Sequence, residues 1–283
     1  MTNQTTVSIL GAGSMAEALI GGIARNNGGK APHITVLNAN NRKRLNQLHA
    51  AYGVHAAQSY EEAVKGKDVI VLAIKPHNVQ EVADSLVSLL DPQKQLVISV
   101  AAGIKLETLE SWLPADTAVI RAMPNTSARV LASATTLSIG TYATERQLAF
   151  AKTLFSSIGT VTVVDEQQMD AATGIAGSGP AYIYYVAEAM LNAAIAEGLS
   201  PTEARALINQ TIGGAAKQLS NSSKSPKDLY KEIMSPNGTT EAAIAHLDHS
   251  SAQELFQQAI HQAVKRSAAI GASFERDPIH KHQ

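Results

Sequence analysis

The sequence predicts an α/β protein in which a doubly wound, mostly parallel sheet precedes an all-helical region. Short β-branched runs alternate with helical segments over the first 163 residues, which is the pattern of such a sheet. A glycine-rich turn joins the first of these runs to the first helix. After Asp165 the strand signal stops, and the hydrophobic period changes from two residues to 3.6. We therefore expect two domains, 1–163 and 164–283, with no Pro/Ser-rich linker between them.

Strands are expected where β-branched or apolar residues run together between turn-forming residues. Segment 68–76 is the clearest case, because nearly all of its residues are apolar, as in a strand buried on both faces. The predicted strands are 5–10, 33–38, 68–76, 95–103, 117–124, 134–140 and 159–165. Helices are expected between them; the first opens at the glycine-rich turn and the second ends at Gly53.

Helical patterns fill the rest of the chain. The predicted helices are 166–176, 180–198, 201–220, 226–233, 239–248 and 251–271. The most apolar run, 180–199, contains Glu188, Asn192 and Glu197, so it reads as a core helix and not as a membrane span.

Composition excludes several classes of function. A net charge of −1 provides no electrostatic basis for binding nucleic acid or a membrane surface. The chain has no Cys, which excludes disulfides, thiol catalysis and Cys-based metal sites and fits a reducing compartment. The N-terminal segment lacks the basic stretch of a signal peptide, and His246 and His249 have no carboxylates arranged to complete a metal site. We expect a cytoplasmic protein that uses no metal ion.

The glycine-rich turn has the form G-x-G-x-x-A between a strand and a helix. Gly11 allows the tight turn, Gly13 lets backbone approach a diphosphate, and Ala16 lets the helix pack closely on the strand. The helix N-terminus would face the phosphates. An isolated match of this kind can also be a simple packing turn, but the βαβ context favours dinucleotide binding. The expected contacts include Ser14 and Met15, which follow Gly13.

The end of the second strand indicates which dinucleotide is bound. An NAD site usually has Asp or Glu there to bind the ribose hydroxyls, but this strand ends in Asn38. Arg42 and Arg44 follow and could bind a 2′-phosphate. This pattern favours NADPH as the cofactor, with NADH possible. The alternative is that both arginines only make a surface helix more soluble.

Two further strand ends are expected at the same edge of the sheet, where ligands of such folds bind. The backbone there could line the nicotinamide and its ribose. The residues are Ala73, Ile74, Lys75 and Pro76 after one strand, and Ala101, Ala102 and Gly103 after the next. Lys75 could equally be a solvated lysine. RAMPNT (121–126) could shape the pocket or be a structural turn, and GIAGSGPAY (174–182) is better explained by close helix packing.

Six small or turn-forming residues, SPNGTT (235–240), stand before a short helix. Gly238 frees the backbone, and the following helix begins with unpaired N–H groups and the positive end of its dipole. Such a turn can hold a carboxylate on backbone amides, with hydroxyls adding donors. The alternative is an elaborate N-cap, which the spacing alone favours; a neighbouring NADP domain shifts the balance toward substrate binding, because a reductase must hold its substrate.

In chain order, the segments GAGSMAEAL, AIKP, ISVAAGI, RAMPNT, GSGPAY and SPNGTTEAA resemble pyrroline-5-carboxylate reductase. The resemblance covers nearly the whole chain. The glycine-rich turn is generic, whereas RAMPNT, GSGPAY and the Ser-Pro-x-Gly-x-Thr turn together are specific. The resemblance implies a Rossmann domain, a helical dimerisation domain, and reduction of 1-pyrroline-5-carboxylate to L-proline with NAD(P)H, the last step of proline synthesis.

The resemblance also implies roles for the SPNGTT turn. Backbone amides and hydroxyls of Ser235, Gly238, Thr239 and Thr240 are expected to hold the carboxylate and ring nitrogen of the substrate. Thr240 is the candidate catalytic residue, because a protonated C=N bond is already electrophilic and needs orientation more than a strong acid. The family usually has a second Gly where Asn237 stands. Asn tolerates a left-handed backbone better than most residues, so we expect the turn to keep its shape.

The resemblance further implies a homodimer, from which a higher oligomer could be built, in which one chain's SPNGTT turn completes the site on the other chain. Two alternatives stay open. A 3-hydroxyacid dehydrogenase would need a positioned Lys or His acid, but after Gly179 none occurs before Lys217. A non-catalytic NADP-binding regulator is the other alternative.

Overall fold

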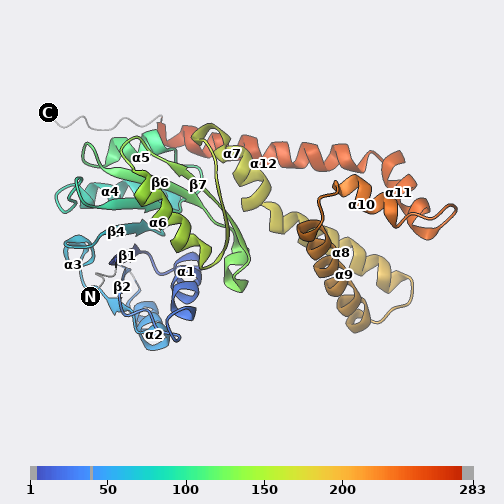
Figure 1. Ribbon diagram of the computed structural model, residues 1–283, viewed down its shortest axis with the longest axis horizontal. Coiled ribbons are helices and arrows are strands. Elements are labelled where there is room, and N and C mark those ends of the chain that lie inside the picture. Colours follow the sequence, from blue (N-terminus) through green and yellow to red (C-terminus); the bar gives the residue numbers. More distant parts are fainter. Residues whose placement is uncertain (1–4, 39–40, 276–283) are drawn as a thin grey trace. The chain divides into compact units, whose positions relative to one another are not determined.

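The computed structural model describes residues 5–38 and 41–275 (Figure 1). Its strands are β1 (Val7–Leu10), β2 (Ile34–Leu37), β3 (His55–Ala56), β4 (Val69–Leu72), β5 (Leu96–Ser99), β6 (Ala118–Met123), β7 (Ser133–Ile139) and β8 (Gly159–Val163). They form one sheet in the order β3-β2-β1-β4-β5-β6-β7-β8. All neighbouring strands are parallel except β6 and β7. The predicted doubly wound, mostly parallel sheet is confirmed.

Helices cover both faces of this sheet (Figure 1). They are α1 (Ser14–Arg25), α2 (Arg42–Tyr52), α3 (Tyr60–Val64), α4 (Val79–Leu86), α5 (Leu106–Trp112) and α6 (Glu145–Ser156). One apolar core joins the sheet to α1, α2 and α6, and a second joins it to α3, α4 and α5. Val7 belongs to the first core and Leu10 to the second, because successive side chains of a strand point to opposite faces. The sheet is therefore buried on both sides.

The short elements β3 and α3 have no counterpart among the sequence predictions. β3 has two residues and α3 has five, so neither is long enough to produce a readable hydrophobic period. Each is defined by its neighbours instead. Thr35 and Val36 of β2 pair with His55 and Ala56, and the side chain of Ser59 accepts a hydrogen bond from the N–H of Glu62 at the start of α3.

After β8 the described chain is helical. The helices are α7 (Met169–Ala172), α8 (Gly179–Ala196), α9 (Pro201–Asn221), α10 (Pro226–Glu232), α11 (Thr239–His249) and α12 (Ala252–Glu275). The helix expected over 166–176 is not one α-helix. It consists of a 3₁₀ turn, η3 (Glu166–Gln168), then α7, then a π-helical turn, η4 (Thr173–Gly177), in which Ser178 N–H donates to the carbonyl of Thr173 at 3.0 Å. Of the described helices, none is long and apolar enough to cross a membrane.

The chain forms two compact units. One contains the residues up to Pro180 together with those from Ala263 onward, and the other contains Ala181–Gln262. The first unit thus holds the whole sheet and also the C-terminal part of α12. The domain boundary expected at 163–164 stays a prediction.

A buried ion pair fastens the sheet to the segment that follows it. Arg121 of β6 is only 2% exposed, and its Nη1 lies 2.5 Å from Oε1 of Glu166. The same carboxylate oxygen accepts a hydrogen bond from the N–H of Leu106, the first residue of α5, at 3.1 Å. Glu166 therefore links the end of a central strand, the start of a covering helix and the entry into the helical region.

Two adjacent glycines of α1 provide a matched test of how tightly this helix packs. A Cβ at Gly22 would lie 2.6 Å from the carbonyl oxygen of Ser157, whereas at Gly21 the nearest atom would be the Tyr52 hydroxyl at 3.5 Å. We expect Gly22→Ala to lower the free energy of unfolding by about 1–3 kcal/mol through overpacking. Gly21→Ala should leave it unchanged or raise it by up to about 1 kcal/mol through helix propensity. Denaturant unfolding of both variants measures the difference, and equal values would contradict the close approach.

Candidate active site

The glycine-rich turn joins the end of β1 to the start of α1. Gly11 has φ 115°, and a Cβ there would lie 2.1 Å from the carbonyl oxygen of Ala73, so only glycine fits. Gly13 is the N-cap of α1, and a Cβ on it would meet no atom within 4 Å. Ala16 is fully buried against the core. The turn therefore presents an open backbone surface at a helix N-terminus, which fits the diphosphate of a dinucleotide.

The guanidinium of Arg44 uses its nitrogens for contacts within the protein, including one with this turn. Its Nε donates to the carbonyl of Ala12 at 3.1 Å, and its Nη2 is paired with the carboxylate of Glu17. Its Nη1 is 3.4 Å from Oε1 of Gln47. All three nitrogens of the guanidinium have a partner within the protein. Arg44 thus braces the turn between its two glycines, which does not support the role in 2′-phosphate binding that the sequence suggested for it.

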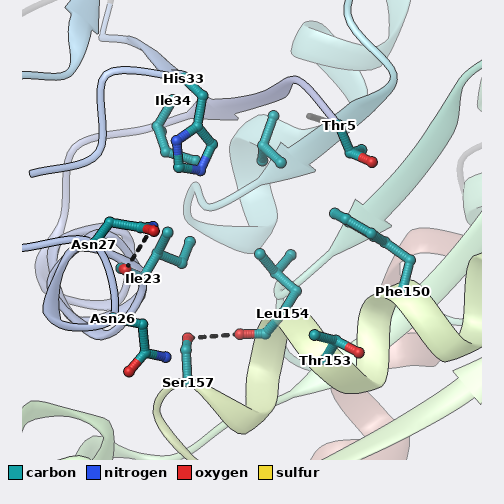
Figure 2. Close-up of a pocket in the computed structure, with 11 residues that line it drawn as sticks. Thr5, Ile23, Asn26, Asn27, His33, Ile34, Phe150, Thr153, Leu154 and Ser157 are labelled. Atoms are coloured by element: carbon teal, nitrogen blue, oxygen red, sulfur yellow. Dashed lines mark hydrogen bonds between the residues drawn. The ribbon is translucent and has the colours of Figure 1, made fainter. Parts of the chain in front are cut away.

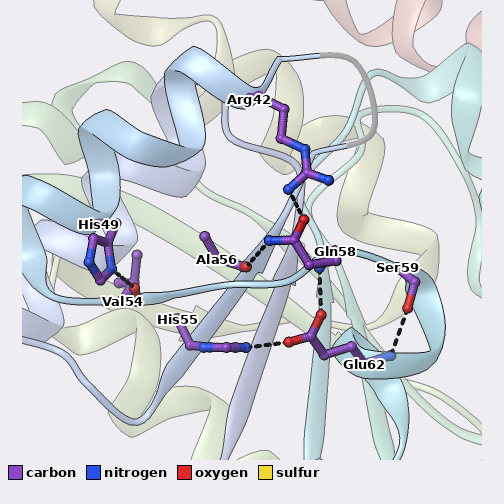
Figure 3. Close-up of polar contacts among 8 residues, drawn as sticks. All are labelled: Arg42, His49, Val54, His55, Ala56, Gln58, Ser59 and Glu62. Atoms are coloured by element: carbon purple, nitrogen blue, oxygen red, sulfur yellow. Dashed lines mark hydrogen bonds and ion pairs between the residues drawn. The ribbon is translucent and has the colours of Figure 1, made fainter.

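Arg42 is placed differently. It is exposed at the start of α2, where Asn41 is the N-cap and accepts a hydrogen bond from Arg44 N–H at 2.9 Å. Figure 3 shows Arg42 donating to the side-chain oxygen of Gln58. This partner is a neutral amide, and among the described residues no carboxylate forms an ion pair with Arg42. Asn38 directly follows β2 at the same edge of the sheet.

A chain of hydrogen bonds holds the partner of Arg42 in position (Figure 3). Gln58 N–H donates to Oε2 of Glu62 at 2.6 Å, and Oε1 of Glu62 lies 2.6 Å from Nε2 of His55. The N–H of Gln58, and then the ring of His55, hold the pKa of the Glu62 carboxyl below its usual value. The carboxylate that accepts the Gln58 N–H therefore persists to lower pH, and the Gln58 side chain is held by its own Nε2, which donates to the carbonyl of Ala56 at 3.3 Å.

The ends of β4 and β5 lie beside the glycine-rich turn. Ala73 N–H donates to the carbonyl of Leu10 at 2.8 Å, which places the segment Ala73–Pro76 next to Gly11. Lys75 is exposed there. The segment Ala101–Gly103 follows β5, which pairs with β4. The structure therefore brings these two predicted segments to the same edge of the sheet as the turn.

Gly103 has a packing role that the sequence did not indicate. It has φ 83°, and a Cβ on it would lie 2.5 Å from a methyl carbon of Ile270 in α12. A Cβ on Gly271 would in turn meet the carbonyl oxygen of Gly103 at 2.7 Å. Lys105 and Glu275 form an ion pair of 2.7 Å beside them. Gly103 is thus needed for the close contact with α12, whatever its role toward the cofactor.

RAMPNT ends in a well-ordered turn. Asn125 Nδ2 donates to the carbonyl of Ala176 in the π-helical turn at 2.9 Å, and Oδ1 accepts from Ser127 N–H at 3.1 Å. A Cβ on Gly177 would lie 2.9 Å from Cε of Met123, so this glycine of GIAGSGPAY permits close packing, whereas a Cβ on Gly179 would meet no atom within 4 Å. The following 3₁₀ turn, η2 (Thr126–Val130), carries Arg129, whose Nη2 donates to Oγ of Ser14 at 2.8 Å. Sequence analysis did not single out this residue, because one basic residue in a loop has no distinctive spacing.

The SPNGTT turn lies in the second compact unit. Gly238 is the N-cap of α11, and its N–H donates to the carbonyl of Ser235 at 2.9 Å. A Cβ on Gly238 would lie 2.3 Å from Oγ of Ser235, so the turn needs glycine. Asn237 has φ 58° and thus takes the left-handed conformation expected for it. Its N–H donates to Oε2 of Glu241 at 2.7 Å, which holds the turn against the helix.

This turn leaves a set of donors for a ligand. No side chain of the turn caps α11, so the N-cap interpretation does not explain its hydroxyls. Thr239 and Thr240 open the helix, and their N–H groups are among those that a helix leaves unpaired. Over the part of the chain that the structure describes, the hydroxyls of Ser235, Thr239 and Thr240 have no hydrogen-bond partner. Amides and hydroxyls of this kind suit a carboxylate.

A hollow of about 280 Å³ lies at the other end of the sheet (Figure 2). It is lined by Thr5 and His33, which precede β1 and β2, and by Phe150 and Leu154 of α6. Burial lowers the pKa of the His33 side chain. Ligands of doubly wound sheets bind outside the carboxyl ends of the strands, so this hollow is not where the cofactor is expected. Across the described ranges, no three His, Cys, Asp or Glu side chains gather in a way that could hold a metal ion.

Comparison with known proteins identifies relatives over both regions. Residues 166–270 match the family described as pyrroline-5-carboxylate reductase dimerisation, and residues 6–103 match the family described as NADP oxidoreductase, coenzyme F420-dependent. Pyrroline-5-carboxylate reductase 2 of Bacillus subtilis is 43% identical over 98% of this chain and 99% of its own. The pyrroline-5-carboxylate reductase of Arabidopsis thaliana is 38% identical over 94% of this chain and 96% of its own.

Solved structures agree with these matches. A pyrroline-5-carboxylate reductase from Coxiella burnetii superposes with a TM-score of 0.88 at 34% identity, covering 95% of this chain and 99% of that one. The Plasmodium falciparum pyrroline carboxylate reductase, solved with NADP bound, superposes with a TM-score of 0.85 at 26% identity, covering 96% and 100%.

Proposed function

This chain belongs to the pyrroline-5-carboxylate reductase family, and from that membership we propose which residues bind the cofactor, hold the substrate and complete the site. The reaction is reduction of the C=N bond of 1-pyrroline-5-carboxylate to L-proline, the last step of proline biosynthesis. NAD(P)H, when bound, supplies the hydride. The observation that carries the assignment is the pair of donor-rich turns, one at Gly11–Met15 and one at Ser235–Thr240, in a chain of this family.

NADPH is the preferred cofactor in this proposal. Backbone at Gly11, Gly13, Ser14 and Met15 binds the diphosphate, because the start of α1 is open there. Arg42 binds the 2′-phosphate, because among the described residues its guanidinium meets the neutral amide of Gln58 and no carboxylate. Asn38 lies beside the adenosine ribose and has no carboxylate to repel that phosphate. Ala73, Ile74, Lys75, Pro76, Ala101, Ala102 and Gly103 line the nicotinamide side.

The substrate carboxylate binds at the start of α11. The N–H groups of Thr239 and Thr240 and the Ser235 hydroxyl provide its donors, and Gly238 keeps the turn compact enough to present them. The Thr240 hydroxyl orients the ring nitrogen. A protonated C=N bond accepts hydride without a strong protein acid, so the absence of Lys and His between Gly179 and Lys217 is compatible with this chemistry. That same absence disfavours a 3-hydroxyacid dehydrogenase, which needs such an acid.

The protein works as a homodimer with shared sites. Its dimerisation region leaves large apolar side chains open to solvent in the single chain; Tyr185 is 76% exposed and Leu255 is 61% exposed. A second copy would bury such residues, because an oligomer hides apolar surface that one chain cannot. We propose that the SPNGTT turn of one copy serves the cofactor domain of the other, that higher oligomers are built from dimers, and that the protein is cytoplasmic.

Separate substitutions distinguish the two arginines near the cofactor turn. Arg42→Ala should weaken NADPH by roughly tenfold to a hundredfold and leave NADH nearly unchanged, because one charge-assisted contact to the 2′-phosphate is lost. Arg44→Ala should weaken both cofactors by similar factors, because it releases the carbonyl of Ala12 and the carboxylate of Glu17. Dissociation constants from fluorescence titration provide the comparison. Equal losses for both cofactors in Arg42→Ala would remove the phosphate role from this residue.

Thr240→Val tests the substrate site together with the reaction itself. The purified protein should oxidise NADPH only when 1-pyrroline-5-carboxylate is added, which a regulatory protein or a 3-hydroxyacid dehydrogenase would not do. The variant should lose about tenfold to a hundredfold in kcat/KM, because it lacks one hydrogen bond to the ring nitrogen. Its melting temperature and NADPH affinity serve as internal controls and should not change. An unaltered rate would leave Thr240 as an ordinary first-turn residue of α11.

Complementation between two inactive variants tests the shared site. Gly13→Asp should repel the diphosphate, and its Cβ has room. Thr239→Asp should repel the substrate carboxylate, and an acidic residue in the first turn favours the helix; a change at Gly238 is less suitable because it would collide with Ser235. With random mixing half of the dimers are mixed, and one of their two sites is intact, so activity should return to about a quarter of wild type. No recovery, with mixed dimers shown by mass spectrometry, would mean that each chain builds its own site.

A further inference from the structure

The side chain of Arg129 reaches the glycine-rich turn from a distant part of the chain. Its Nη2 donates to Oγ of Ser14 at 2.8 Å, across 115 positions of sequence. Ser14 is the first residue of α1 and directly follows Gly13, where the backbone is open. A guanidinium therefore lies beside the surface that fits a dinucleotide diphosphate.

Among the described residues, no carboxylate pairs with this guanidinium. Arg44 faces the carboxylate of Glu17, and Arg121 faces that of Glu166. Within the described ranges Arg129 forms no ion pair, and the Ser14 hydroxyl is its one hydrogen-bond partner. Since a guanidinium has five N–H donors, most of them remain available to a ligand.

The turn that carries Arg129 is firmly held against α1. Ala128 is buried in the same apolar core as Ala16 of α1. Asn125 N–H donates to Oγ of Ser133 at 3.1 Å, and Leu131 closes the turn with φ 58° and an N–H bond of 3.1 Å to the carbonyl of Ala128. A left-handed Leu is costly and is kept only where surrounding structure requires it. Arg129 thus projects from a fixed base and not from a loose loop.

We propose that Arg129 is a cofactor-binding residue whose guanidinium donates to the diphosphate of the bound dinucleotide. This proposal rests on the proposed function, because it needs a dinucleotide in the site. Arginine matches phosphate geometry with paired N–H donors, and the α1 N-terminus adds its amides to the same anion. Ser14 holds the guanidinium beside the site when no dinucleotide is bound. Arg129 therefore binds the diphosphate, which NADPH and NADH share, whereas Arg42 binds the 2′-phosphate, which only NADPH has.

Binding of ADP-ribose tests this assignment without any turnover. ADP-ribose has the diphosphate but lacks both the nicotinamide and the 2′-phosphate. Calorimetry on the full-length protein should show that Arg129→Gln weakens ADP-ribose, NADH and NADPH by a similar factor of about tenfold or more, as expected for a charge-assisted contact. Arg129→Lys keeps the charge without the paired donors and should lose less. Arg146→Gln removes an exposed arginine of α6 and should change none of the three affinities.

Four other outcomes would overturn the proposal. Unchanged affinities with a lowered melting temperature of the free protein would make Arg129 a structural tie between η2 and α1. A loss for NADPH alone would assign it to the 2′-phosphate. Unchanged ADP-ribose binding with a raised KM for 1-pyrroline-5-carboxylate would assign it to the substrate carboxylate. If the wild-type protein binds none of the three ligands, the cofactor proposal and this one fail together; if it binds them without turnover, only the proposed function fails.

Discussion

At Gly11 the chain turns with φ 115° against the carbonyl of Ala73 at the end of the neighbouring strand. This contact leaves no space for a side chain, and it sets where α1 begins relative to β4. The open backbone at Gly13 and the hydroxyl of Ser14 follow directly from this turn, and the Ala73–Pro76 segment, which we propose to line the nicotinamide side, lies against it. A larger residue at Gly11 would collide with the carbonyl of Ala73 and push the start of α1 away from the end of β4.

Around that turn three arginines have different surroundings and hence different uses. Arg44 gives its donors to the Ala12 carbonyl and to Glu17, so its charge stabilises the turn itself. Arg42 donates to the side-chain oxygen of Gln58, and no carboxylate of the described residues pairs with it. Arg129 lies in η2, after β6, and its guanidinium donates to the hydroxyl of Ser14. Charge compensation distinguishes them: Arg44 is paired with a carboxylate, whereas Arg42 and Arg129, which pair with no carboxylate among the described residues, are the two that we propose to bind phosphate.

The helical region follows a related principle with neutral groups. Its turn before α11 uses Gly238 to bring backbone against Ser235 and Asn237 to adopt φ 58°, and it leaves the first amides of the helix unpaired. Unpaired amides of this kind can hold an anion without a cation, which is why we propose this turn as the site of the substrate carboxylate. The same region exposes large apolar residues, and it matches a family model of pyrroline-5-carboxylate reductase dimerisation.

The sequence by itself determined the fold class, the long strands and helices, the glycine-rich turn and the SPNGTT turn before α11, because each has a local signature in period, small residues or caps. It missed β3 and α3, which are too short to show a period, and it expected one helix where η3, α7 and a π-helical turn lie. Only the tertiary structure separated Arg42 from Arg44, showed Gly103 against Gly271, and brought Arg129 to Ser14. Those contacts join residues far apart in the chain, and a side chain's partner at such a distance follows from packing and not from spacing.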